Sequence, residues 1–268
     1  MKINNVLKGI LAVTLAVPFL AGCSSSNNDE TTSLLEQIKE KGEITIGTEG
    51  NYSPFTFHNS DDKLVGYDVE IAEEIAKKLG VKAHFVETKW DGLIAGLDAK
   101  KYDVVINQVG ITDERKAKYL FSTPYTYSYA SVITTKDNDS IKTFDDLKGK
   151  KSAQTADSNW AKLVESKGGE IVATGGFDQS LELVLQGRVD ATVNDSVTYL
   201  DYLNQKPDAN VKVAAQSDEV TQSAVLIRQE DGKELQDAIN QALKELEDDG
   251  TLTHISNKYF GEDVSKAK

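Results

Sequence analysis

The first half of the chain alternates between two hydrophobic periodicities, one typical of buried strands and one typical of amphipathic helices. Apolar side chains recur every three or four positions between Asp68 and Leu79, and Gly80 follows. This pattern predicts a helix that Asp68 caps and Gly80 ends. The same reasoning predicts a helix at 91–100 and strands at 43–47, 81–86 and 103–106. The last strand is an apolar run of the kind buried in a parallel sheet, so the expected fold class is α/β.

The second half repeats part of this pattern. A shift of 87 positions places the segment 90–107 on 177–194, and in both a helix is followed by a short strand that ends in asparagine. The match is short, and buried helix–strand units share such patterns, so coincidence remains an alternative. Ligands of open α/β sheets bind beyond the carboxyl ends of the strands. We therefore expect a ligand between two similar lobes, near Asn107 and Gln108 of one and Asn194 and Asp195 of the other.

The C-terminal part is expected to return to the first lobe. A strand at 223–228 precedes a long amphipathic helix at 231–249 and a short helix at 251–260. We predict that 35–126 and 222–268 form lobe 1 and that 127–221 form lobe 2. The chain would then cross between the lobes twice, at a hinge near 125–130 and 221–225.

The N-terminus has the pattern of an export signal. Lys2 and Lys8 precede an apolar run that is too short to span a bilayer, and Leu-Ala-Gly-Cys at 20–23 resembles the bacterial lipobox. Residues 1–22 are predicted to be a lipoprotein signal peptide, and Cys23 the lipidated first residue of the mature chain. The alternative is a plain signal peptide with an idle cysteine. A single thiol cannot form an intramolecular disulfide, which favours the anchor, and the polar stretch at 23–34 is expected to be a flexible tether.

Composition narrows the class of function. The chain carries a net charge of −13, and removing the two lysines of the signal peptide makes it −15. An acidic chain without a basic run argues against nucleic acid as a partner. The three histidines are scattered, and no metal-binding, Walker or dinucleotide-binding motif is present, so we expect no metal and no cofactor. No catalytic motif in the sequence points to an enzyme.

One loop is a candidate anion site. The predicted strand at 103–106 is followed by a loop that turns into a helix at 110–115. Free backbone N–H groups at a helix start favour an anion, and the planar guanidinium of Arg115 suits a carboxylate. The alternative is that Arg115 is a surface residue paired with Asp113 or Glu114.

Three segments resemble one family. The sequence from 88 to 126, which includes Asn-Gln-Val at 107–109 and Gly-Ile-Thr-Asp-Glu-Arg at 110–115, resembles the family-3 solute-binding proteins of ABC importers. The segments 47–55 and 66–70 fit the same family, and the resemblance covers about 35–261. The Asn-Gln-Val loop is similar to that of the cystine-binding branch. The resemblance implies a two-lobed type II periplasmic-binding-protein fold that closes over an amino acid in the cleft.

The resemblance also implies residue roles. Arg115, with backbone groups near Gly110 and Ala156, would hold the α-carboxylate of the ligand, and Asp195 would accept its α-ammonium. Thr112 is also expected among the ligand-binding residues. Tyr52 and Trp90 would flank the side chain, Glu49 would face its polar far end, and Asn107 and Gln108 would line the site. Asp157 and Ser158 are weaker candidates. Taken singly, the aromatic residues could be core or rim residues, Asp195 could cap the helix at 196–205, and the two amides could only terminate a strand.

The function implied is that of a monomeric, lipid-anchored receptor on the extracellular face of a bacterial membrane. It would bind L-cystine and deliver it to an ABC permease without bond chemistry. The alternatives are a receptor for arginine or glutamine, because Glu49 would also suit a cationic tip, and an enzyme on the same scaffold. The enzyme would need a general acid in the cleft, for which Glu49 is the candidate.

Overall fold

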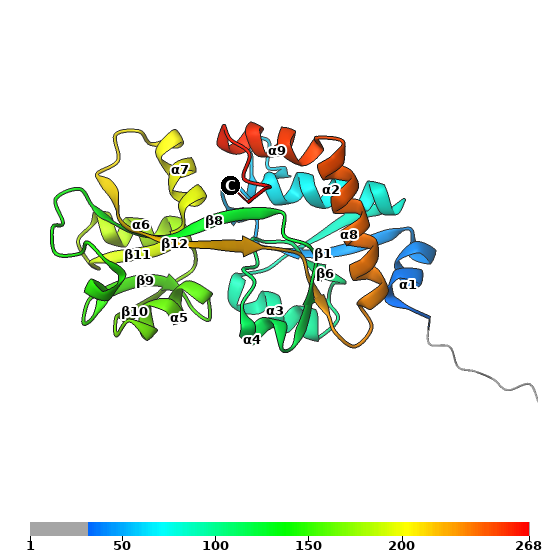
Figure 1. Cartoon of the computed structure of the whole chain (residues 1–268), viewed down its shortest axis with the longest axis horizontal. Helices are drawn as coiled ribbons and strands as arrows, with labels where there is room; N and C mark the ends of the chain where they lie inside the picture. The colour runs from blue at the N-terminus through cyan, green and yellow to red at the C-terminus, as the bar shows by residue number, and fades with distance from the viewer. Residues whose placement is uncertain (1–31, 268) are drawn as a thin grey trace, which may run out of the picture. The chain divides into compact units, whose positions relative to one another are not determined.

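Two five-stranded mixed sheets organise residues 32–267, which are the part of the chain that the computed structural model describes (Figure 1). The predictions for the signal peptide, Cys23 and most of the tether lie outside the described residues. Residues Thr32–Lys268 group as one compact unit, so the proposed division into two lobes stays a prediction. No helix among residues 32–267 is long and apolar enough to cross a membrane.

The first sheet is built around β1. Parallel neighbours flank this strand on both sides, and the last two strands of the sheet run antiparallel to their neighbours. In order across the sheet the strands are β5 (Lys82–Glu87), β1 (Glu43–Thr48), β6 (Val104–Val105), β13 (Leu226–Arg228) and β7 (Tyr119–Phe121). A small antiparallel sheet follows β1 in the chain and consists of β2 (Asn51–Tyr52), β3 (Thr56–His58) and β4 (Leu64–Val65).

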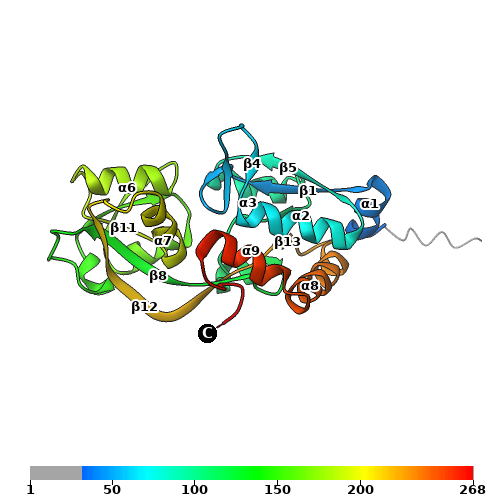
Figure 2. The ribbon, with the colours of Figure 1, turned by 90° about the horizontal axis from the view of Figure 1, so that it is seen from above.

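The second sheet has three parallel strands and two antiparallel ones. Its order is β10 (Glu170–Thr174), β9 (Lys151–Thr155), β11 (Ala191–Asp195), β8 (Thr126–Thr135) and β12 (Val211–Ser223). β8 and β12 pair along their length and reach back to the first sheet, where the N–H of Tyr125 donates to the carbonyl of Ser223 over 3.0 Å (Figure 2). The segments 125–130 and 221–225, where the sequence predicts two crossings, pair with each other at this end of the two strands.

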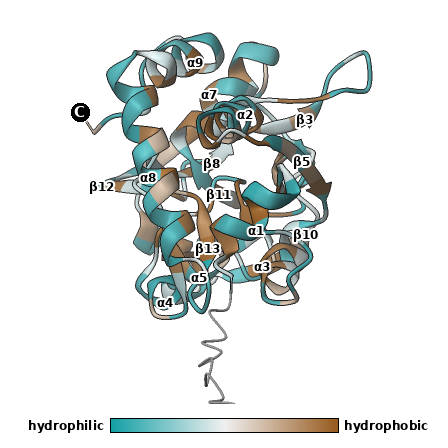
Figure 3. Ribbon diagram, turned by 90° about the vertical axis from the view of Figure 1, so that its right-hand side faces the viewer, coloured by the Kyte–Doolittle hydropathy of each residue, from teal (hydrophilic) through white to brown (hydrophobic). Residues whose placement is uncertain are grey.

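Helices cover both sheets with their apolar faces inward, and their outer faces are hydrophilic (Figure 3). Those beside the first sheet are α1 (Leu34–Lys41), α2 (Tyr67–Leu79), α3 (Trp90–Asp98), α4 (Asp113–Lys116), α8 (Lys233–Asp248) and α9 (Thr251–Phe260). Those beside the second are η1 (Phe144–Leu147), α5 (Asn159–Ser166), α6 (Phe177–Leu185) and α7 (Ser196–Gln205). Four leucine and isoleucine side chains of α8 are almost fully buried, as the periodicity of the sequence predicts.

The α/β fold class is confirmed, and one capping prediction is wrong. Gly66 occupies the N-cap of α2, and Asp68 lies within the first turn. The side chain of Asp68 is buried and accepts hydrogen bonds from Gln108, 40 residues away, in place of the free N–H groups of its own helix. The predicted end of the helix is correct, since Gly80 follows α2 in the left-handed conformation.

Candidate functional site

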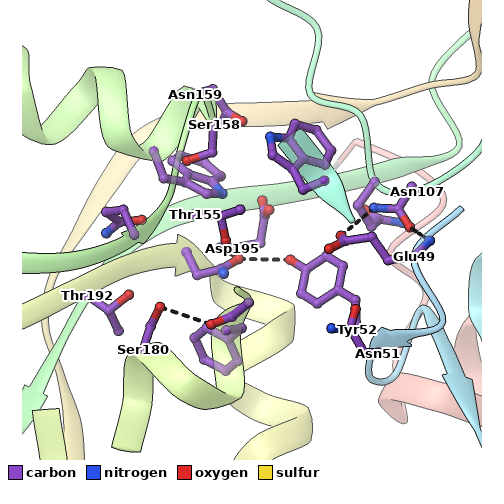
Figure 4. A pocket seen from close by; sticks show the side chains of 17 residues that line it. Glu49, Asn51, Tyr52, Asn107, Thr155, Ser158, Asn159, Ser180, Thr192 and Asp195 are labelled. Atoms are coloured by element: carbon purple, nitrogen blue, oxygen red, sulfur yellow. Dashed lines mark hydrogen bonds between the residues drawn. The ribbon is translucent and has the colours of Figure 1, made fainter. Parts of the chain in front are cut away.

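One cavity lies where strands of both sheets end. The space between its walls, counting its open mouth, is about 570 Å³. In Figure 4, Glu49 and Asn107 lie together at one side of the cavity, Ser180 and Thr192 lie at the other, and Tyr52 lies between them. The full lining is Glu49, Asn51, Tyr52, Trp90, Asn107, Gln108, Gln154, Thr155, Ser158, Asn159, Trp160, Gly176, Phe177, Ser180, Thr192, Asn194 and Asp195.

The two strand ends that the internal repeat singles out meet at this cavity. Asn107 and Gln108 follow β6 in the first sheet, and Asn194 and Asp195 end β11 in the second. All four residues line the cavity. Because parallel strands direct their carboxyl ends to one edge of a sheet, two facing sheets of this kind enclose a space suited to a ligand.

Glu49 is held by the amide of Asn107. The Nδ2 atom of Asn107 donates to Oε2 of Glu49 over 2.8 Å, and its Oδ1 atom accepts from the Glu49 N–H over 2.9 Å. Oδ1 also accepts from the hydroxyl of Thr48. Burial raises the pKa of Glu49, and the bond from Asn107 opposes this effect. Asn107 therefore orients a carboxylate toward the cavity and does more than terminate a strand.

Tyr52 joins the two sides of the cavity. Its hydroxyl donates to Oδ1 of Asn194 over 3.0 Å and lies 3.2 Å from the hydroxyl of Thr198 on α7. Its ring packs against Phe55, with the ring centroids 4.9 Å apart. Burial raises the pKa of Tyr52 well above its ordinary value, so the hydroxyl stays protonated and available as a donor.

Arg115 lies behind the cavity wall and stacks on Trp90. The centre of its guanidinium lies 5.2 Å from the Trp90 ring centroid, and Nη1 donates to the carbonyl of Gly110 over 2.8 Å. Thr112 caps α4 by accepting the Arg115 N–H over 3.2 Å. Arg115 is only 8% exposed, and burial lowers its pKa.

The alternative that Arg115 is paired on the surface is wrong. Asp113 pairs with Lys116, and Glu114 pairs with Lys162. Within residues 32–267, Arg115 forms no ion pair at 4 Å or less, although it is buried. A buried cation without a bonded counter-charge is costly, and an anionic ligand would offset that cost.

Asp195 presents the opposite charge on the other side. It occupies the N-cap position of α7, yet its side chain makes no capping bond, so the capping alternative is wrong. One of its oxygens, Oδ1, accepts from the hydroxyl of Thr221 over 3.0 Å. Burial raises the pKa of Asp195 to about 6, and hydrogen bonds from hydroxyl groups including that of Thr221 limit the rise. Within the described chain no lysine, arginine or histidine pairs with it.

The cavity does not contain every expected residue. Gly110, Thr112, Arg115 and Ala156 lie outside its lining, as does Asp157, whereas the weaker candidate Ser158 is part of it. Gly110 is nevertheless close, because a Cβ atom at that position would lie 3.5 Å from Asn159 and 3.7 Å from Arg115.

Several lining residues were missed by sequence reasoning. Ser158 caps α5 through the Ala161 N–H, so Asn159 and Trp160 in the first turn face the cavity next to the end of β9. Phe177 could have been found, because the internal repeat places it on Trp90. Asn51, Gln154, Thr155, Gly176, Ser180 and Thr192 carry no signal in the sequence that would single them out. Among residues 32–267 no cluster of histidine, cysteine and carboxylate side chains is suited to a metal ion.

Comparison with known proteins places these features in a family. The model of the bacterial extracellular solute-binding proteins, family 3, matches residues 44–262. The L-cystine-binding protein TcyA of Bacillus subtilis is 47% identical over 97% of this chain and 99% of its own. The L-cystine solute receptor of Neisseria gonorrhoeae, in its unliganded open conformation, is 42% identical, with a TM-score of 0.61 over 88% of this chain and 99% of that one.

A second solved structure agrees better in shape. An ancestral arginine-binding protein bound to arginine is 38% identical, with a TM-score of 0.76 over 82% of this chain and 99% of that one. The family model and the solved structures agree on the fold, and they confirm the two-lobed type II periplasmic-binding-protein architecture expected from the sequence. The chain belongs to the bacterial extracellular solute-binding proteins of family 3.

Proposed function

We propose that this protein is the substrate-binding protein of an amino-acid ABC importer and that its ligand is L-cystine. The observation that carries the proposal is a pair of buried, opposite charges beside one cavity: Asp195 lines it, and Arg115 lies behind the wall that Trp90 forms. Arg115 belongs to the first sheet's side and Asp195 to the second, and neither has an ionic partner within residues 32–267. A zwitterionic amino acid supplies the missing partner of each.

The α-amino-acid group would be held at both of its charges. The guanidinium of Arg115 would bind the carboxylate, with the Thr112 segment and backbone groups near Gly110 and Ala156 beside it, because a planar guanidinium can bind a carboxylate through two bonds. Asp195 would accept the ammonium, since a carboxylate whose burial raises its pKa gains most from a cation. Arg115 has to turn from the Gly110 carbonyl toward the cavity for this contact.

The side chain of the ligand would extend between Tyr52 and Trp90 toward Glu49. Cystine carries a second ammonium group at that end, which the Glu49 carboxylate would bind. Gln108 and Asn107 would complete the wall. The names and high identity of the cystine-binding relatives support this assignment.

Arginine is the second candidate ligand. Its guanidinium would meet Glu49 in the same way, and the arginine-bound ancestral protein resembles this chain closely in shape. Glutamine would leave Glu49 without a cation, so it is the weaker alternative.

Ligand binding would stabilise a closed arrangement of two lobes. Lobe 1 would comprise 35–126 and 222–268, and lobe 2 would comprise 127–221, with β8 and β12 as the hinge. A ligand that contacts both sides shifts the equilibrium by its differential affinity for the closed form. The protein would act by binding alone, as a monomer held on the extracellular face of the membrane through Cys23, and would pass the ligand to a permease.

A thermal-shift screen with reductant tests the ligand assignment. Cystine, arginine, glutamine and cysteine are each added with and without a phosphine reductant. The chain has one cysteine, so reduction cannot break an intramolecular disulfide of the protein. We expect cystine to raise the melting temperature most, because only a ligand that prefers the folded form does so. Reductant should abolish that shift and leave any arginine shift intact. A shift with arginine alone would replace cystine, and no shift with any amino acid would refute the proposal.

A further inference from the structure

Asp68 is a buried carboxylate that does not line the cavity and forms no ion pair within residues 32–267. It is 1% exposed and lies in the first turn of α2. Its Oδ2 atom accepts the backbone N–H of Gln108 over 2.7 Å, and Oδ1 accepts from Nε2 of the same residue over 2.6 Å. One carboxylate therefore fixes both the backbone and the side chain of a single residue.

Gln108 needs such support because its backbone is in the left-handed region, with φ at +50°. A residue with a branched or long side chain adopts this conformation only when its surroundings stabilise it. Gln108 also lines the cavity. Its conformation consequently determines the shape of the cavity wall just after β6.

The same hydrogen-bond network extends to the start of β8. Nε2 of Gln108 also donates to the hydroxyl of Thr126, the first residue of β8, over 3.0 Å. The hydroxyl of Tyr67, next to Asp68, donates to the carbonyl of Tyr125 over 2.7 Å. The first turn of α2 thus binds both the cavity wall and the start of β8.

We propose that Asp68 is a positioning residue that couples the cavity wall at Gln108 to the start of β8 at Thr126. The inference rests on the proposed function in one respect, since the cavity has to be the ligand site. Through this coupling, a ligand that contacts the wall after β6 and a movement at the start of β8 would affect each other.

The charge state of Asp68 supports this role. Burial raises its pKa to about 7, and the bonds from Gln108 oppose the rise. The titratable groups around it are phenols: Tyr67 on its own helix, Tyr125 before β8 and Tyr52 on β2. No described cation pairs with Asp68. The phenol of Tyr125 also acts on Asp68 and opposes the rise in its pKa. Gln108 Oε1 is buried without a hydrogen-bond partner among the described residues, so a protonated Asp68 would have a new acceptor within the same network after rotation of the amide.

Replacement of Asp68 by its amide is the first test. Asp68→Asn keeps the shape but turns one acceptor into a donor that faces a donor of Gln108. We expect at least a tenfold loss of affinity for the amino acid that binds the wild type, measured by calorimetry at pH 8. The matched control is Asp103→Asn, because Asp103 accepts the Thr45 N–H over 2.8 Å, outside the cavity lining. This control should change affinity less than twofold.

An exchange of the two groups separates positioning from mere folding. In the double variant Asp68→Asn/Gln108→Glu, the amide at 68 can accept the backbone N–H and donate to the carboxylate at 108. We expect recovery of at least part of the lost affinity. The wild-type affinity should also rise with pH through about 7, and Asp68→Asn should remove that step. Unchanged affinity in Asp68→Asn, or no rescue by the exchange, would overturn the inference.

A ligand-free measurement keeps the two proposals separate. The side-chain amide of Gln108, followed by NMR without ligand, should shift as Asp68 titrates and lose that titration in Asp68→Asn. A Gln108 amide whose chemical shift does not change with pH near 7 would refute the coupling even if amino acids bind. A wild type that binds no amino acid would instead refute the proposed function.

Discussion

The hydroxyl of Tyr52 donates a hydrogen bond to Oδ1 of Asn194, 142 residues further along the chain, over 3.0 Å. Tyr52 belongs to β2, beside the first sheet, and Asn194 belongs to β11 of the second. Both residues line the cavity. A contact of this kind stabilises the arrangement in which the cavity walls face each other and is lost when they separate.

Replacing Tyr52 by phenylalanine should weaken ligand binding about three- to tenfold, because a neutral hydrogen bond contributes roughly 0.5–1.5 kcal/mol. The loss should appear mainly as faster dissociation, measured by stopped-flow fluorescence. Tyr119→Phe is the matched control, since it removes a hydroxyl that bonds to Asp98 on the outer surface. Equal effects of both variants would show that the Tyr52 hydroxyl has no special role at the cavity.

Arg115→Ala should reduce affinity by about 2–5 kcal/mol, because the ligand carboxylate would lose its guanidinium partner. Arg115→Lys should also bind weakly, since an ammonium group cannot reproduce the planar fork or its stacking on Trp90. Arg188→Ala, at an exposed position, serves as the control. Calorimetry that shows less than a tenfold loss for Arg115→Ala would remove Arg115 from the carboxylate site.

Binding should weaken as the pH falls below about 6. Burial raises the pKa of Asp195 to about 6 in the ligand-free protein, and a bound ammonium would lower it again. Binding at lower pH therefore has to release a proton, and affinity falls by up to about tenfold per pH unit below the ligand-free pKa. In the ligand-free protein the sign is reversed, because a raised carboxyl pKa makes stability fall as the pH rises from about 4 to about 6.

Calorimetry in two buffers of different ionisation enthalpy at pH 5.5 would count the released proton. Asp195→Asn should remove the proton that Asp195 releases, leave the one that Asp68 releases, and weaken binding at pH 8. Unchanged affinity in this variant would show that the carboxylate does not receive the ammonium. A constant affinity between pH 5 and pH 8 would contradict the same assignment.

Glu49→Gln should distinguish ligands by the charge of their far end. Cystine and arginine should lose roughly tenfold to a hundredfold in affinity, because a bond to a charged group contributes about 1.5–3 kcal/mol. Glutamine has no cation there, so its binding should change little. Titration of the three amino acids into both proteins measures the difference. An equal loss for all three would mean that Glu49 acts on the shape of the cavity through Asn107 and not on the ligand.

Cys23→Ser should release the protein into the culture medium of a Gram-positive host, because the proposed lipid anchor is the only membrane attachment predicted from the sequence. Fractionation and immunoblotting compare the variant with the wild type. Retention of the variant in the membrane fraction would refute the anchor. Ligand affinity should be the same in both, since Cys23 precedes the folded body by a polar stretch.

Much of the fold follows from local patterns. Helix α2 ends at the predicted glycine, and helix α8 buries the apolar residues that their spacing predicts. The repeat that pairs Asn107 with Asn194 correctly identifies two strand ends at one cavity. These features depend on periodicity and on glycine conformation, which act over a few neighbouring residues.

The contacts of the individual polar side chains were decided only by the tertiary structure. The sequence pattern predicts that Asp68 caps a helix, but its side chain bonds to Gln108. Arg115 has acidic neighbours in the sequence that could pair with it, but it stacks on Trp90. Trp160 and Asn159 line the cavity, although no signal in the sequence singles them out. A helix or strand is specified by residues close in sequence, whereas the partner of a buried charge depends on which distant segments pack against it. The sequence by itself therefore determined the elements and the edge at which they meet, and long-range packing determined the partners of the buried charges around the cavity.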